Sequence, residues 1–495
     1  MVSTLIKNAG AIVTCDAADN VYRDTDILIG GGRILKIGQG LTAGADKLGN
    51  VGNVGKAGNV GNAGNVGNVG NAGKVDKVDE IIDGRGKFVY PGLINTHHHF
   101  FQTFARNLIA IDYPNMLVVQ WLDKIYQIFQ LIDSDVIYYS SLTAMADLIK
   151  HGCTCAFDHQ YCYTKATGKS PVDRQMEAAQ LLGIRYHAGR GVNTLPRSEG
   201  STMPENMLET TDEYLKDCER LIGLYHDPKP FAMSRIALAP CQPINCYPET
   251  FKETAALARK HGARMHTHLG EGENEIMLRR WGKRTLAWCE EMGFIGPDVW
   301  VAHDWEIIPE EYAVMAKYQT GISHCPGPAV LGGFPIIDIK ALLGAGISVS
   351  LGCDGSATND SSNLLDSLRM AYLMQAYHSK QRGGAVSAYD MLKVATAEGA
   401  KTLDRPELGS LEAGKAADLF MIDAETLELT GALHDPKHLL ARVGVTGPVW
   451  LTMINGKTVY REGRLTGVEE RELARAGEAV CDRALRSRCD AFHNL

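Results

Sequence analysis

The pattern of hydrophobic and polar positions changes twice along the chain and so divides it into three parts. Residues 12–14, 26–29 and 33–37 are short apolar runs separated by turn-forming stretches such as Gly30-Gly-Gly, a pattern typical of β-strands. From Pro91 to about residue 408, apolar runs alternate with helical stretches. From Gly409 the β pattern returns, and Asn455-Gly456 predicts a hairpin turn between two of its strands.

The middle part predicts a parallel sheet. Strand-like runs occupy residues 155–158, 185–188, 236–240, 264–268, 299–303, 321–324 and 347–354, and helices are predicted over 248–261 and 309–318. Strand–helix alternation on this scale is typical of α/β proteins, and the number of units fits a (β/α)8 barrel of the TIM type. We therefore predict a barrel over residues 91–408.

The two ends of the chain are predicted to form one small β-sandwich, because neither set of strands alone makes a good core. Its parts are residues 1–90 and 409–466, and a C-terminal helix is expected over 467–495. Residues 45–80 form a low-complexity insertion, in which a glycine falls at every third position from Gly49 to Gly73. The tract has no proline and is not collagen-like. Ordering it would cost much backbone entropy, so we predict an expanded loop.

Composition narrows the class of protein. Of the 495 residues, 45% are hydrophobic and 22% charged, which is typical of a globular protein, and the net charge is −8. This charge argues against nucleic acid or an anionic membrane as a partner. No apolar run reaches the roughly 18 residues of a membrane span, and the N-terminus lacks the features of a signal peptide. We predict a cytoplasmic protein whose 12 cysteines are reduced and mostly buried.

The most informative chemical feature is a histidine cluster at the end of an apolar run, Pro91-Gly-Leu-Ile-Asn-Thr-His-His-His99. Alternate side chains of an extended strand point the same way, so His97 and His99 can reach one point while His98 points elsewhere. Two converging imidazoles make half of a metal site. The alternative is a histidine-rich turn without a ligand.

Three later strand ends supply the missing groups. His268 ends one run and has Glu271 three residues on, His303 ends the next, and Asp354 follows a late strand beside glycines. In (β/α)8 barrels the carboxyl ends of the strands carry the chemistry. Three histidines and an aspartate converging there predict a zinc or iron(II) site with room for one water.

This order of motifs resembles the amidohydrolase superfamily. Pro91-Gly-Leu-Ile-Asn-Thr-His-x-His99, His268-Leu-x-Glu271 and Asp354-Gly-Ser-Ala-x-Asn359 are most similar to its cytosine- and guanine-deaminase-like branch. The block Gly409-Ser-Leu-Glu-Ala-Gly-Lys-Ala-Ala-Asp418 is similar to the usual C-terminal β domain of that branch. The blocks that begin at Asn95, Asp158 and Arg235 look most like 8-oxoguanine deaminases.

The resemblance implies a role for each residue. His97, His99, His268 and Asp354 correspond to the ligands of one divalent metal, most simply Zn²⁺ with Fe²⁺ as the alternative, which activates water. Asp354 would accept the water's proton, Glu271 would protonate a ring nitrogen of the substrate, and His303 would orient the hydroxide. The implied reaction is hydrolytic deamination of an amino-substituted purine, pterin or pyrimidine, with release of ammonia.

Candidate substrate contacts are Gln102, Arg190 and Trp121. Gln102 could bind a lactam edge or cap the following helix. Arg190 could hold a substrate carbonyl or form a structural salt bridge. Trp121 could stack on a ring or pack in the core.

Three segments depart from the family pattern: Gln-Pro-Ile-Asn after Cys241, Gly-Glu273 after Glu271, and Gly-Pro-Ala-Val after His324-Cys-Pro. We expect them near the mouth of the pocket, where they leave the substrate open. Chloride or amine removal from an s-triazine on the same scaffold is therefore a second hypothesis, and a non-catalytic scaffold with a structural metal is a third. The resemblance also implies a homo-oligomer, at least a dimer.

Overall fold

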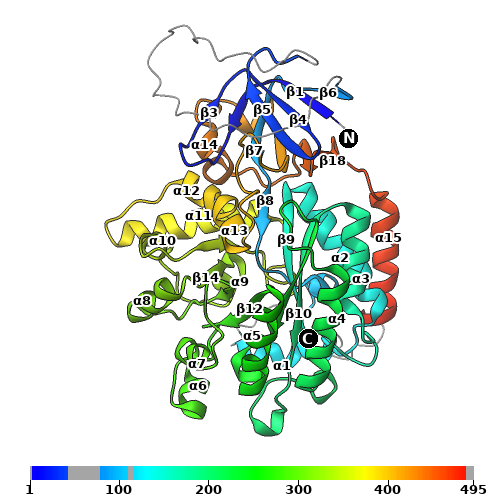
Figure 1. Cartoon of the computed structure of the whole chain (residues 1–495), viewed down its shortest axis with the longest axis vertical. Helices are drawn as coiled ribbons and strands as arrows, with labels where there is room; N and C mark the ends of the chain where they lie inside the picture. Colours follow the sequence, from blue (N-terminus) through cyan, green and yellow to red (C-terminus); the bar gives the residue numbers. More distant parts are fainter. Residues whose placement is uncertain (1–2, 43–77, 110–115, 117, 487–495) are drawn as a thin grey trace.

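The structure is a computed structural model that describes residues 3–42, 78–109, 116 and 118–486. Residues 45–77 of the predicted glycine-rich loop and the end of the predicted C-terminal helix lie outside the described residues, whereas Glu80 at the end of that loop begins a strand. A small β domain sits at one end of the molecule, and a barrel wrapped in helices forms the rest (Figure 1).

Eight parallel strands form the barrel, as predicted. Each pairs with the next in sequence order. They are β8 (Leu93–Asn95), β9 (Cys153–Gln160), β10 (Arg185–Val192), β11 (Ser234–Pro240), β12 (Arg264–Leu269), β13 (Val299–His303), β14 (Gly321–His324) and β15 (Val349–Leu351). The N–H of Thr96 donates to the carbonyl of Leu351 at 3.0 Å, which links β15 back to β8.

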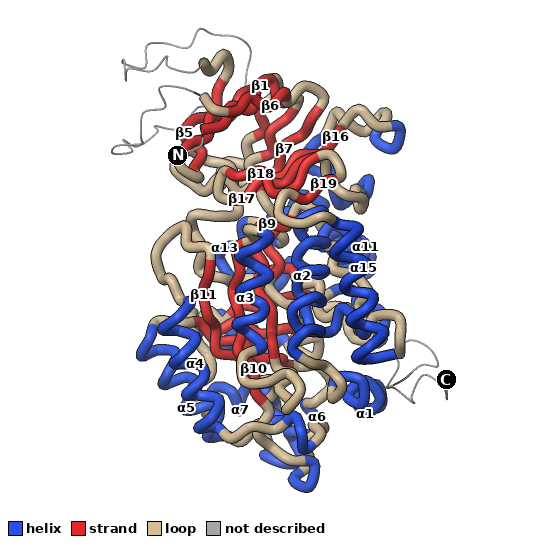
Figure 2. The backbone as a smooth tube through the Cα atoms, turned by 90° about the vertical axis from the view of Figure 1, so that its right-hand side faces the viewer, coloured by secondary structure: helices blue, strands red, loops and turns tan. Residues whose placement is uncertain are grey.

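Helices surround these strands (Figure 2). They are α2 (Ser134–Lys150), α3 (Pro171–Leu182), α4 (Thr211–Tyr225), α5 (Pro248–His261), α6 (Asn274–Trp281), α7 (Thr285–Glu291), α8 (Pro309–Tyr318), α9 (Pro326–Leu331), α10 (Ile339–Gly344), α11 (Leu364–Gln381), α12 (Ala388–Val394) and α13 (Ala397–Thr402). The predicted helices 248–261 and 309–318 are α5 and α8. Both begin with proline at the first turn, where its missing N–H costs nothing, and α5 ends at Gly262 with φ of 65°.

The β domain joins both ends of the chain, as predicted. One sheet has the order β5 (Arg33–Gly38), β4 (Thr25–Gly30), β1 (Ser3–Ala9), β6 (Glu80–Asp83). The other has the order β19 (Arg464–Leu465), β18 (Lys457–Arg461), β17 (Leu451–Ile454), β16 (Leu419–Asp423), β7 (Lys87–Pro91), β2 (Ala11–Val13), β3 (Val21–Tyr22). The central strand β7 pairs with β2 on one side and β16 on the other. Ile6 and Ile29 of one sheet share a buried core with Val89 and Met421 of the other.

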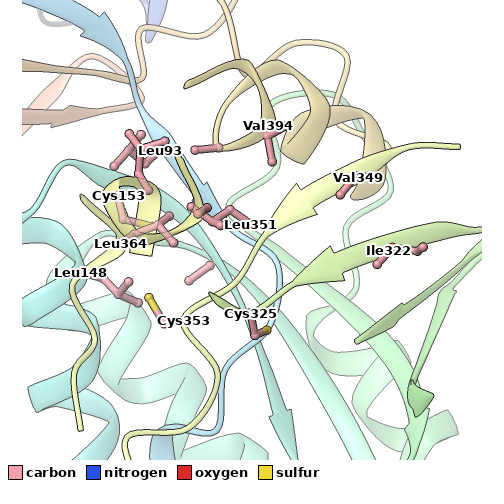
Figure 3. Packing of buried hydrophobic residues seen from close by; sticks show 14 of the residues in the cluster. Leu93, Leu148, Cys153, Ile322, Cys325, Val349, Leu351, Cys353, Leu364 and Val394 are labelled. Atoms are coloured by element: carbon pink, nitrogen blue, oxygen red, sulfur yellow. The ribbon is translucent and has the colours of Figure 1, made fainter. Parts of the chain in front are cut away.

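Buried apolar residues fill the seam where the barrel closes. Leu93 of β8, Leu351 of β15 and Val394 of α12 pack together there (Figure 3). The β domain covers the end of the barrel where the strands begin, because β7 leads directly into β8 (Figure 1). At this end the buried Arg185 pairs with Asp418, at 2.7 Å from Nε to Oδ2. The carboxyl ends of the strands therefore face away from the β domain.

The remaining helices lie outside this scheme. α1 (Val118–Phe129) follows the 3₁₀ turn Phe100–Ala105, and α15 (Glu470–Cys481) packs on α2 (Figure 2). A short helix, α14 (Pro436–His438), leads into a π-helical turn, Leu439–Gly444. Within the described part of the chain, no helix is both long enough and apolar enough to cross a membrane. Each cysteine in the described residues is buried and free of disulfide bonds.

Candidate metal centre and pocket

The predicted ligands meet at the carboxyl ends of β8, β12 and β15. The carboxylate oxygen Oδ1 of Asp354 lies 3.3 Å from Nε2 of His97 and 3.3 Å from Nε2 of His99. Nε2 of His99 lies 3.1 Å from Nε2 of His268. Four side chains from three strand ends thus direct one donor atom each toward the same point.

Hydrogen bonds fix which ring nitrogen each histidine presents. Nδ1 of His99 lies 2.8 Å from the carbonyl of His159, and Nδ1 of His268 lies 2.7 Å from the carbonyl of Cys241. A carbonyl only accepts, so each Nδ1 carries the proton and each Nε2 presents its lone pair.

His97 is oriented by a second imidazole. Nδ1 of His266 donates to the carbonyl of Trp300 at 2.9 Å, so its Nε2 accepts from Nδ1 of His97, also at 2.9 Å. Nε2 of His97 is left buried without a hydrogen-bond partner. This arrangement matches the outer-sphere hydrogen bonds that orient histidine ligands in metalloproteins.

Three separations between the donor atoms fit the binding of one zinc ion. Zinc binds imidazole nitrogen at about 2.0–2.1 Å, which places neighbouring ligand atoms of a tetrahedron about 3.3 Å apart. The three measured separations, 3.1, 3.3 and 3.3 Å, are close to this value. Burial lowers the pKa of both His99 and His268 to about 4, so the imidazoles are neutral and able to coordinate at physiological pH.

Asp354 and His303 sit on backbone that non-glycine residues seldom adopt. Their φ angles are 64° and 73°, in the left-handed region. Such conformations concentrate at functional sites, where surrounding structure holds them. Oδ1 of Asp354 accepts the N–H of Gly355 at 2.7 Å, and Oδ2 accepts the Thr358 hydroxyl at 3.1 Å. Burial works to raise the pKa of Asp354, but His303, His99 and His268 outweigh it, so the pKa is lowered.

Glu271 lies beside this cluster. Its Oε1 is 3.8 Å from Nε2 of His303, and its Oε2 accepts a long hydrogen bond of 3.5 Å from Nε2 of Gln242. Burial raises the pKa of Glu271 well above its usual range, and the charges of Asp354 and Glu273 raise it further. Both ring nitrogens of His303 are buried without a partner, and burial lowers its pKa to about 3. Glu271, with its raised pKa, and the neutral imidazole of His303 therefore lie beside the ligand cluster.

A pocket opens onto these groups. Its wall carries the side chains of Trp121, Leu122, Tyr126 and Tyr161. Its remaining polar lining consists of Gln102, Gln242, Thr358 and the thiol of Cys241, besides His99, His268, Glu271 and Asp354. No lysine or arginine lines it within the described residues. The described lining therefore offers no basic side chain to a negatively charged ligand.

Two of the three predicted substrate contacts line this pocket. Gln102 offers its amide, with Oε1 accepting weakly from the N–H of Ala357 at 3.4 Å. Trp121 also lines the pocket, and its Nε1 donates to the carbonyl of Ile109 at 2.9 Å.

The third predicted contact, Arg190, does not line this pocket. It bonds Glu209 at 2.7 and 2.8 Å, Asp217 at 2.9 Å and the carbonyl of Gly191. These bonds use four of its five guanidinium N–H groups, and the guanidinium lies over the ring of Tyr163. The geometry favours the structural salt bridge over substrate binding.

Several residues of the site had no role in the sequence prediction. His266 precedes His268 by two positions, so the alternation of the strand could have placed both rings inside the barrel. His159 also lies there. One of its ring nitrogens is within 4.8 Å of the ligand nitrogens of His97, His99 and His268. Tyr126 and Tyr161 carry no motif that could have identified them.

Comparison with known proteins supports this description. The model of the amidohydrolase family matches residues 88–459. Hydroxydechloroatrazine ethylaminohydrolase of Pseudomonas sp. (strain ADP) is 48% identical, with 98% of this chain and 96% of that protein covered. The 8-oxoguanine deaminase of Pseudomonas aeruginosa is 34% identical, with 72% and 78% covered. Atrazine chlorohydrolase of Arthrobacter aurescens TC1, solved with zinc, superposes with a TM-score of 0.85 at 29% identity, covering 97% and 100%.

Proposed function

The chain belongs to the amidohydrolase family, and from this membership we propose that it is a metal-dependent hydrolase that removes an amino group from a carbon of an N-heterocycle. The observation that carries the proposal is the convergence of His97, His99, His268 and Asp354 beside Glu271, whose pKa burial raises well above its usual range. We infer that these four residues hold one Zn²⁺, the ion present in the structure of the Arthrobacter aurescens relative.

The bound ion would supply a Lewis acid and lower the pKa of water to about 7. The side chains supply the remaining steps. Asp354 is placed to accept the proton of the attacking water. Glu271 donates its proton to a ring nitrogen, so that charge does not build up on the ring as the carbon becomes tetrahedral. The C–N bond then breaks as the leaving amine takes the proton that Asp354 accepted, and the hydroxyl proton of the product returns Glu271 to its acid form. His303, neutral and with both nitrogens unpartnered, holds the attacking oxygen by a hydrogen bond.

The residues that line the pocket help to distinguish between possible leaving groups. It offers amides and hydroxyls but, in the described residues, no cation that would recognise an acidic heterocycle. The apolar wall of Trp121, Leu122 and Tyr126 can accommodate an alkyl group on the leaving amine. The 48% identical relative is named an ethylaminohydrolase. Release of an alkylamine from an oxidised s-triazine is therefore a specific second candidate beside release of ammonia from a purine, pterin or pyrimidine.

The test is a panel assay with zinc-loaded protein that measures ammonia, alkylamine and chloride separately. Candidate substrates are 8-oxoguanine, isoxanthopterin, aminopyrimidines, and alkylamino-s-triazines with an oxo or chloro group. Amine or ammonia release supports the proposal, and the product identifies which candidate holds. Chloride release alone, or silence across the panel with metal bound, contradicts it.

Glu271→Gln separates an enzyme from a scaffold that only binds metal. We expect metal content to stay at the wild-type level while turnover falls by about 10²–10⁴-fold, the usual contribution of a general acid. Unchanged turnover in this variant would refute the role given to Glu271.

A further inference from the structure

We propose that Glu273 is a positioning residue that holds the turn from which Glu271 projects. The inference rests on the proposed role of Glu271 as the proton donor. Glu273 belongs to one of the segments that depart from the family pattern. It does not line the pocket. Its contacts are instead with the backbone of the turn.

Both oxygens of the Glu273 carboxylate bind the backbone of this turn. Oε1 accepts the N–H of Gly270 and Oε2 accepts the N–H of Glu271, each at 2.6 Å. Glu273 is only 2% exposed, and it forms no ion pair with lysine or arginine in the part of the chain that the structure describes. A buried carboxylate without a cation is costly unless hydrogen bonds stabilise it. The two N–H groups provide this stabilisation and are satisfied in return.

The opposite side of the turn is held by the end of β13. The N–H of Asp304 donates to the carbonyl of Leu269 at 2.7 Å. Gly270 has φ of 61°, and a Cβ there would lie 2.9 Å from Cα of Asp304. The chain therefore passes between Asp304 and the Glu273 carboxylate with little freedom to shift.

The contacts of the turn with Glu273 and Asp304, together called the clamp, fix the position from which Glu271 transfers its proton. Glu273 binds the backbone N–H of Glu271 itself. The Glu271 side chain, which starts at the adjoining Cα, reaches to 3.8 Å from Nε2 of His303. A shift of the turn by about 1 Å would displace the acid from the substrate nitrogen, and misplacement of that size can cost about 100-fold in rate.

The test is Glu273→Gln, which keeps size and shape but replaces one acceptor with an NH₂ that faces a backbone N–H. We expect kcat to fall about 10- to 100-fold, with KM within about threefold and metal content unchanged. Glu306→Gln is the matched control. Oε2 of Glu306 accepts from Nδ2 of Asn274 at 2.8 Å, so its carboxylate binds the start of α6. Only its backbone N–H, which the substitution keeps, binds the Glu271 turn, at the carbonyl of Gly270. Its kcat should match the wild-type value.

A double variant separates positioning from general destabilisation. If Glu273 acts through Glu271, then adding Glu273→Gln to Glu271→Gln lowers the residual rate by less than about twofold. A full additional loss in the double variant, or unchanged kcat in Glu273→Gln alone, would overturn the proposal. Unchanged turnover in Glu271→Gln would instead overturn the proposed function.

A second variant covers the case in which Glu273→Gln does not fold. Glu273→Asp keeps the charge but is one methylene shorter, so it can reach only one of the two N–H groups. We expect a folded, metal-loaded protein with a smaller loss of kcat. Wild-type kcat in this variant would count against the clamp.

Discussion

Replacing His266 with leucine should weaken metal binding, although His266 is not a predicted ligand. Nε2 of His266 accepts the proton of Nδ1 of His97 at 2.9 Å, and this bond makes Nε2 of His97 the free donor. Leucine fills similar space beside the rings of Phe157 and Trp300 but accepts no hydrogen bond. Without the acceptor, the ring of His97 can rotate or change tautomer, and the metal-competent orientation must be selected at a cost.

The size of the effect follows from these bonds. Loss of an outer-sphere partner of a metal-binding histidine typically costs 10- to 100-fold in affinity, or about 1.4–2.7 kcal/mol. The same substitution leaves a fully buried N–H unsatisfied, which costs about 1–3 kcal/mol of folding stability. The two effects are measured separately.

Metal affinity is measured by competition with a chromophoric zinc chelator, and stability by urea unfolding of the metal-free protein. His324→Leu is the control, because His324 is a buried imidazole with no hydrogen bond to any predicted ligand. We expect a 10- to 100-fold weaker Kd for His266→Leu and a change below about twofold for His324→Leu. A wild-type Kd in His266→Leu would refute the proposed orientation of His97.

Three further outcomes are expected. In Gly355→Ala the new Cβ would lie 1.9 Å from Oε1 of Gln102, so the amide of Gln102 must move. We expect KM to rise about tenfold with metal content unchanged. An unchanged KM would exclude Gln102 from substrate binding. Asp418→Ala strips the buried Arg185 of its partner and should lower the free energy of unfolding by about 3–5 kcal/mol in urea titrations, whereas a loss below 1 kcal/mol would contradict this. Burial lowers the pKa of His324 to about 3 from 6.5. The folded protein thus binds fewer protons than the unfolded chain between these values, and stability present above pH 6.5 is lost as the pH falls, by about 2 kcal/mol at pH 5. His324→Leu should reduce the loss in urea midpoints between pH 7.5 and 5, and an identical pH dependence would contradict the assignment.

The barrel and much of its metal cluster could be predicted because their signals are local. Proline at the first turn and a left-handed residue after the last turn delimit α5 and α8. Asn455 and Gly456, with φ of 52° and 72°, form the predicted hairpin turn because that turn type needs positive φ at both positions. The alternation of a strand likewise directs His97 and His99 to one side.

The alternation of side chains along a strand did not determine how deep each inward side chain lies within the barrel. His266 and His268 both point inward from β12, since they are two residues apart. Only the register of the eight strands decides that His268 reaches His99 while His266 lies one layer below and supports His97.

Long-range contacts likewise depended on the tertiary structure. Arg190 pairs with Glu209 and Asp217, which come from later segments of the chain. The carboxylate of Glu273 folds back under the Glu271 turn, and α1 brings Trp121 and Tyr126 to the pocket. Sequence alone determined which residue types end each strand, because backbone sterics and side-chain alternation act over a few residues. The partners of each charge and the shape of the pocket were decided by packing, because a buried charge takes whichever partner the fold brings within reach.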